Sequence, residues 1–147
     1  MHTDSTRLPV PSLPGGSYTP VVVHQGIAFV SGQLPRFDNV VQYCGKVGDS
    51  IDVAQAQQAA RLCASQCLAA LDRELGGLSR VVRLLRVTGY IASAPGFDQQ
   101  PIVMDAASEY FCEMLGAAGQ HARTAIGVAE LPRGASVEIE ITVAIKD

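Results

Sequence analysis

The feature that most constrains the fold is a strict alternation of apolar and polar residues near the end of the sequence. The apolar residues are Val137, Ile139, Ile141, Val143 and Ile145, and they alternate with Glu138, Glu140, Thr142, Ala144 and Lys146. Successive side chains of a β-strand point to opposite faces of its sheet. The pattern therefore predicts a strand with one face against a core and one face in water.

Two segments with helical spacing can cover the dry face of such a sheet. From residue 53 to residue 75, small and apolar residues recur every three or four positions, behind a cap at Asp52 or Ser50 and ahead of Gly76-Gly77. The small residues would let this helix lie close to the sheet. A second helix is predicted from near Asp98 to a stop at Gly116.

The remaining apolar runs predict the other strands. Residues 21–24 and 27–30 would form a hairpin closed by Gln25-Gly26, with residues 31–35 ending its second strand and residues 36–50 forming a loop. Residues 81–93 would form a strand with a bulge allowed at Gly89, and residues 122–131 a further strand. We expect one α+β domain spanning residues 1–147, with residues 1–15 as an irregular lead-in. Its order is β-β-α-β-α-β-β, with both helices on one face of a single mixed sheet.

Charge and size limit the classes of partner. Only 17% of the 147 residues are charged, so burial of surface in an oligomer is one explanation of the low charge. The net charge is −3 and the eleven basic residues are dispersed, which makes nucleic acid an unlikely partner.

Cysteine usage and the absence of targeting signals favour a cytoplasmic location. Cys44, Cys63, Cys67 and Cys112 contain no C-x-x-C pair, so we expect buried free thiols in a reducing compartment and no metal site. The first eight residues lack the apolar core of a signal peptide, and no apolar run approaches the roughly 20 residues that span a bilayer.

Common catalytic motifs are absent, and a single arginine is the main candidate for function. The sequence contains no P-loop, G-x-G-x-x-G, H-E-x-x-H or G-x-S-x-G pattern. Arg123 lies in a predicted strand, either on a solvated face or projecting into a cleft. A guanidinium group in a cleft would match a carboxylate, because its donors form a rigid fork.

Two further residues have alternative readings of the same kind. Glu138 could be a base in a pocket or a residue on the wet face of its strand, and Tyr18 could line a pocket or cover the core. If residues 132–134 join two adjacent strands, Glu138 would lie beside Ala129. That position is about 20 Å from Arg123 along the strand, so both residues could share a ligand only across a subunit boundary.

Four segments together resemble the RidA/YjgF family, also called the liver perchloric-acid-soluble ribonuclease family. The segments are Tyr18 followed by Ser31-Gly32-Gln33-Leu34-Pro35, the Ala/Gln-rich helix, Ala122-Arg123-Thr124, and Leu131-Pro132 leading into Val137-Glu138-Ile139-Glu140. The resemblance covers roughly residues 15–146, and the A-R-[ST] and L-P-x4-V-E-I-E pair at this spacing is its most specific part.

The resemblance implies a chorismate-mutase-like α+β fold, a homotrimer with clefts between subunits, and no cofactor or metal. The implied activity is that of a hydrolase of the 2-iminobutanoate/2-iminopropanoate deaminase kind. Such an enzyme converts reactive enamines or imines, such as 2-aminoacrylate, to a 2-keto acid and ammonia. By the same resemblance Arg123 would grip the substrate carboxylate with help from the backbone N–H of Gly32, Glu138 would position or activate water, and Tyr18 would line the pocket.

This chain departs from the deaminating members at three places. Ala125 stands where they have cysteine, Asp105 or Ala106 stands where they have asparagine, and His121 is not the commonest residue before Ala122-Arg123. Two alternatives therefore remain open. The chain could be a non-catalytic, metabolite-binding or regulatory protein of the same fold, or an endoribonuclease or translation inhibitor.

Overall fold

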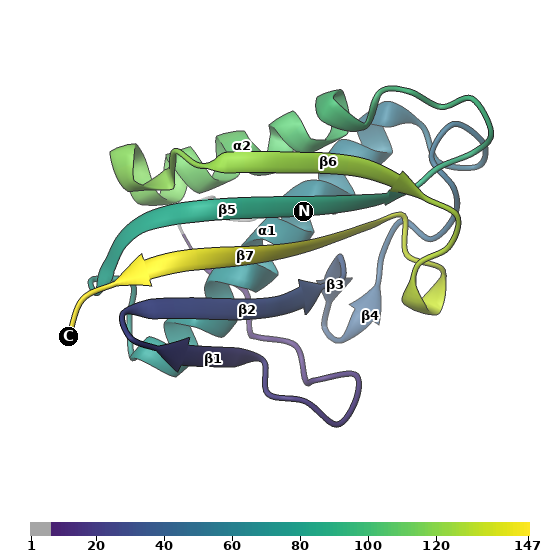
Figure 1. Cartoon of the computed structure of the whole chain (residues 1–147). Coiled ribbons are helices and arrows are strands. Elements are labelled where there is room, and N and C mark those ends of the chain that lie inside the picture. The colour runs from purple at the N-terminus through teal and green to yellow at the C-terminus, as the bar shows by residue number, and fades with distance from the viewer. Residues whose placement is uncertain (1–6) are drawn as a thin grey trace.

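The computed structural model describes residues 7–147, in which five strands form one mixed sheet in the order β1-β2-β7-β5-β6 (Figure 1). Neighbouring strands are antiparallel except β5 and β6, which are parallel. The strands are β1 (Val21–His24), β2 (Ile27–Gln33), β5 (Val81–Ala92), β6 (Ala122–Val128) and β7 (Val137–Ile145). The hairpin predicted at Gln25-Gly26 is confirmed, with His24 paired to Ile27.

Helices α1 (Val53–Leu75) and α2 (Gln100–Leu115) both lie on one face of the sheet, as Figure 1 shows. This arrangement confirms the predicted α+β class. Two short 3-10 helices, η1 (Gly116–Gly119) and η2 (Pro132–Gly134), precede β6 and β7. The helices are tied together by an ion pair between Arg61 of α1 and Glu113 of α2.

The ends of α1 lie where the sequence predicts them. The Asp52 carboxylate accepts a hydrogen bond from the Gln55 N–H at 2.8 Å, and the Gln55 side chain accepts from the Asp52 N–H at 3.0 Å. The two bonds form a capping box that satisfies N–H groups left free at the start of a helix. At the other end Gly76 adopts φ 69°, a left-handed conformation that glycine tolerates best.

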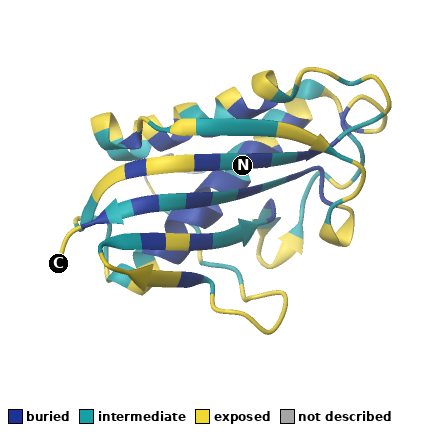
Figure 2. Ribbon diagram, viewed as in Figure 1, coloured by how far each residue is buried: buried dark blue, intermediate teal, exposed yellow. Residues whose placement is uncertain are grey.

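The core lies between the helices and the sheet, and β7 alternates between buried and half-buried residues along its whole length (Figure 2). The buried face of α1 lies close to β7. The thiol of Cys63 donates to the Val137 carbonyl and the thiol of Cys67 donates to the Ile139 carbonyl, both at 3.4 Å. Burial raises the pKa of both thiols. Contrary to the prediction of buried thiols throughout, Cys44 and Cys112 are exposed.

The strand order corrects one inference from the sequence. The sequence predicts that Glu138 lies beside Ala129 if β6 and β7 are adjacent, but β5 lies between these two strands. Glu138 instead pairs with Tyr90 of β5, and Tyr90 pairs on its other side with Ile126 of β6. A crossover through α2 makes β6 parallel to β5, which leaves the second edge of β5 to β7.

Several element bounds also differ from the prediction. Strand β2 continues to Gln33, β6 ends at Val128, and the predicted loop 36–50 contains a small hairpin of β3 (Arg36–Phe37) and β4 (Val40–Val41). The irregularities of β5 lie between Val81 and Arg86 and not at Gly89. A side chain at residue 89 would collide with Met104 of α2, so glycine there permits the helix to approach the strand.

Within residues 7–147, no helix combines the length and the apolar character needed to cross a bilayer. A cytoplasmic location stays a prediction from the sequence.

Candidate functional site

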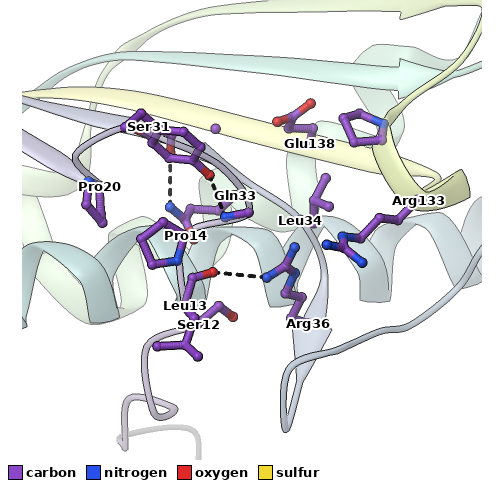
Figure 3. Close-up of a pocket in the computed structure, with 14 residues that line it drawn as sticks. Ser12, Leu13, Pro14, Pro20, Ser31, Gln33, Leu34, Arg36, Arg133 and Glu138 are labelled. Atoms are coloured by element: carbon purple, nitrogen blue, oxygen red, sulfur yellow. Dashed lines mark hydrogen bonds between the residues drawn. The ribbon is translucent and has the colours of Figure 1, made fainter.

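A pocket of about 370 Å³ opens beside β2 and the start of β7 (Figure 3). Four parts of the chain form it: residues 12–20 before β1, residues 31–36 from the end of β2 to β3, η2, and the start of β7. Its lining residues are Ser12, Leu13, Pro14, Gly15, Tyr18, Pro20, Ser31, Gly32, Gln33, Leu34, Arg36, Pro132, Arg133 and Glu138. Three residues named from the sequence, Tyr18, Gly32 and Glu138, are therefore brought together.

Glu138 lies against the backbone of Gly32. The pairing of β2 with β7 is interrupted between Val30 and Gln33, so Ser31 and Gly32 form a bulge beside the glutamate. A Cβ atom placed on Gly32 would lie 2.5 Å from a carboxylate oxygen of Glu138. The Ser-Gly-Gln segment thus makes room for this carboxylate, because any side chain at residue 32 would displace it from this position.

The carboxyl group of Glu138 is a candidate acid or base. Burial raises its pKa above the ordinary value for glutamate, and the nearby charge of Glu140 raises it further. Glu140 itself accepts a hydrogen bond from the Tyr90 hydroxyl at 2.5 Å. A carboxylate with a raised pKa is a stronger base at neutral pH than an exposed one.

Tyr18 is held over the pocket by the lead-in. Its hydroxyl oxygen accepts from the Gly15 N–H at 3.1 Å, and the side chain is half-exposed. The Ser31 hydroxyl donates to the Thr19 carbonyl at 3.0 Å, which fixes the segment next to the bulge. The phenol therefore keeps its own proton free to donate to a ligand.

Arg123 does not reach this pocket within its own chain. It pairs with Val87 of β5, whereas Glu138 pairs with Tyr90, three residues further along the same strand. An odd separation along a strand places the two side chains on opposite faces of the sheet. Arg123 is on the helix side and Glu138 on the open side.

The Arg123 guanidinium is held by α2. Its Nη1 lies 2.9 Å from a carboxylate oxygen of Asp105 and 3.1 Å from the Ser108 hydroxyl oxygen, and its Nη2 donates to the Pro101 carbonyl at 3.3 Å. The side chain is 23% exposed. Of the two residues that the sequence offers at the asparagine position, Asp105 makes this contact with Arg123.

His121 extends the Arg123 network. Its Nδ1 lies 2.6 Å from the Gly119 carbonyl oxygen, and its Nε2 lies 2.9 Å from the Ser108 hydroxyl oxygen. Because a carbonyl only accepts, Nδ1 carries the proton in the neutral ring and Nε2 accepts from Ser108. Ser108 is not among the site residues predicted from the sequence, although its spacing of three from Asp105 places both on one face of a helix.

The pocket also contains two arginines that are not among the predicted site residues, Arg36 and Arg133. The sequence places Arg133 in a turn between two predicted strands and Arg36 in a predicted loop. Arg133 adopts φ 58°, which is uncommon for a residue other than glycine.

Comparisons with known proteins agree with the fold and with the predicted family. A family model described as endoribonuclease L-PSP matches residues 11–145. The chain is 37% identical to the protein TCP17 of Trypanosoma cruzi over 142 residues, which cover 96% of this chain and 89% of that protein.

Two solved structures are similar over most of their length. The protein Atu1372 of Agrobacterium tumefaciens has 42% identity and a TM-score of 0.86, covering 88% of this chain and 83% of that one. A suggested endoribonuclease of Shewanella oneidensis has 25% identity and a TM-score of 0.91, covering 95% and 92%. On the family match, the chain belongs to the endoribonuclease L-PSP family, the RidA/YjgF family that its sequence motifs indicate.

Proposed function

We propose that this protein hydrolyses reactive enamines or imines of the 2-aminoacrylate kind to a 2-keto acid and ammonia. The observation that carries the proposal is the placement of Glu138 beside the Gly32 bulge, in a pocket that also contains Tyr18. The reaction needs little from the protein, because an imine carbon is already electrophilic. Orientation, a water molecule and proton transfer are sufficient.

Glu138 is the general base of this proposal. It removes a proton from water as the water oxygen bonds to the imine carbon, and the nitrogen takes up a proton. The hydroxyl proton of the resulting carbinolamine then passes through Glu138 to the nitrogen, the C–N bond breaks to release ammonia, and the C–O bond becomes the carbonyl of the keto acid. An enamine enters the same sequence after a proton moves from its nitrogen to its β-carbon, which makes it an imine. General base catalysis by a positioned carboxylate contributes roughly 10²–10⁴-fold to the rate. The Tyr18 hydroxyl can donate a hydrogen bond to the reacting nitrogen or oxygen.

In this proposal, Arg123 of a neighbouring subunit binds the carboxylate of the substrate. Within one chain, Arg123 and Glu138 lie on opposite faces and are separated by β5. Proteins of this family are typically oligomeric. The open face also exposes Val22, Phe29 and Ile126, each at least 43% exposed, and a homotrimer would bury such an apolar surface.

The test supplies freshly generated 2-aminoacrylate and measures release of ammonia and keto acid. Wild-type protein should accelerate release, and Glu138→Gln should lower the rate while leaving keto-acid binding intact. Release no faster than in buffer would contradict the proposal. Light scattering at micromolar concentration should report a trimer, and a monomer would contradict the shared cleft.

One observation favours a second candidate function. Arg123 already has a carboxylate partner in Asp105 at 2.9 Å, so its charge is partly satisfied before any ligand binds. A non-catalytic metabolite-binding protein of the same fold would tolerate this arrangement. Such a protein would bind keto acids without accelerating ammonia release. The ribonuclease activity that the family description names is tested separately by RNA cleavage, and the net charge of −3 does not favour it.

A further inference from the structure

The pocket that holds Glu138 also contains two arginine side chains for which the described residues supply no carboxylate partner. Arg36 and Arg133 both line it, and within residues 7–147 neither has a carboxylate oxygen within 4.0 Å of its guanidinium nitrogens. Figure 3 shows the guanidinium group of Arg133 extending towards that of Arg36. Two like charges that converge in one pocket repel each other unless an anion lies between them.

Arg36 is held in place by the surrounding chain. Its guanidinium group nevertheless has hydrogen-bond donors that these contacts do not use. Its Nη1 donates to the Leu13 carbonyl at 3.1 Å, and its backbone carbonyl accepts from the buried Gln66 side chain at 3.0 Å. Its Nε is buried and has no hydrogen-bond partner in the part of the chain that the structure describes. A buried donor without a partner is unfavourable, and a ligand anion nearby would offset part of this cost.

Arg133 approaches the same place from the other side. It lies in η2 between Pro132 and Gly134, and its left-handed φ of 58° is an unfavourable conformation for arginine. Unfavourable backbone conformations of this kind are concentrated at ligand-binding sites. The two arginines outweigh the single carboxylate of Glu138, so the pocket has a net positive charge.

From these contacts we infer that Arg36 and Arg133 form a second anion subsite, which binds a carboxylate or phosphate group at the far end of the substrate. The inference rests on the proposed function and narrows its substrate class to 2-imino acids with a second anionic group. A cavity of about 370 Å³ is within the range of small-molecule sites and leaves room for such a chain. The carboxylate of Asp105 pairs with Arg123 and not with Arg36 or Arg133.

The experiment compares three stable 2-keto acids by calorimetry on the full chain. 2-Oxobutyrate has one carboxylate, 2-oxoglutarate adds a distal carboxylate, and 3-phosphohydroxypyruvate adds a distal phosphate. The variants are Arg36→Gln, which removes the charge but keeps a polar side chain, and Arg133→Asn, which suits a left-handed residue. Arg73→Gln, at the exposed end of α1, is the matched control.

Wild type and the control should bind at least one doubly charged acid about ten- to a hundredfold more tightly than 2-oxobutyrate. The acid that shows the preference identifies the distal group as carboxylate or phosphate. Each pocket variant should lose most of the preference while its affinity for 2-oxobutyrate stays within about twofold.

Two results would overturn the subsite: equal affinity of wild type for all three acids, or a preference that survives in both variants. If either result is found while 2-oxobutyrate still binds and imines are still hydrolysed, the subsite inference is wrong but the proposed function stands. Failure of all three acids to bind would overturn the proposed function as well. Circular dichroism of each variant checks that it is folded. If Arg36→Gln is not folded, Arg133→Asn still tests the subsite, because Arg133 is exposed.

Discussion

The Nη1 atom of Arg123 lies 2.9 Å from a carboxylate oxygen of Asp105, across the contact between β6 and α2. The arginine assigned to a substrate carboxylate thus has a carboxylate of its own. The Asp105 side chain is 57% exposed, so the pair is accessible to a ligand and its net contribution to stability is small. A bound carboxylate would compete with Asp105 for the donors of Arg123.

Replacing Asp105 with asparagine should strengthen the binding of 2-keto acids. Asparagine keeps an oxygen that can accept from Arg123 but removes the competing negative charge. Because exposed ion pairs contribute up to about 1 kcal/mol, we expect an affinity gain of up to about fivefold by calorimetry. Glu109→Gln, an exposed change on the same helix, is the control and should have no effect. If Asp105→Asn binds 2-keto acids more weakly than wild type, Asp105 instead orients Arg123 for its ligand.

Removing Arg123 should abolish most keto-acid binding without unfolding the protein. Loss of a charge-assisted contact weakens binding by roughly ten- to a hundredfold, and Arg123→Lys should recover little of it because an ammonium group lacks the bidentate fork. Calorimetry with 2-oxobutyrate measures the effect, and light scattering checks the assembly. Equal binding by wild type and Arg123→Ala would leave the arginine with a structural role only.

The stability of the protein should show the raised pKa of Glu138. The folded state binds the Glu138 carboxyl proton more tightly than the unfolded state does. The free energy of unfolding therefore falls as the pH rises from the pKa of Glu138 in the unfolded chain through its higher pKa in the folded protein. Above this window the buried charge is unfavourable. Glu138→Gln should therefore raise the melting temperature at pH 8 relative to wild type, and the difference should shrink at pH 4. A difference that does not change between pH 4 and pH 8 would contradict the argument.

Gly32→Ala should damage both stability and hydrolysis, because its methyl group would lie 2.5 Å from a Glu138 carboxylate oxygen. Because the carboxylate is the movable end of a half-buried side chain, the cost in denaturant unfolding should lie at the lower end of the range for overpacking, about 1 kcal/mol. The same change in a Glu138→Ala background should cost much less, because the colliding carboxylate is gone. Gly16→Ala is a milder control, since its Cβ would meet only Tyr18, at 3.4 Å. Equal costs in both backgrounds would show that the collision is not the cause.

Local patterns in the sequence were sufficient to predict both long helices, the five strands of the main sheet and the family. The start of α1 at a cap on Asp52 or Ser50, its stop at Gly76 and the alternation along β7 depend on near neighbours, so residue spacing alone predicts them. The motifs around Tyr18, Gly32 and Glu138 also indicated three residues that the fold brings into one pocket.

The tertiary structure alone decided the strand order and the composition of the site. Strand order depends on hydrogen bonds between distant segments, so no local pattern places β5 between β6 and β7 or puts Arg123 and Glu138 on opposite faces. For the same reason the sequence did not show that Asp105 pairs with Arg123, or that Arg36 and Arg133 converge on one pocket from segments almost 100 residues apart. Residue types and spacing determined which side chains are available, and long-range packing determined which of them meet.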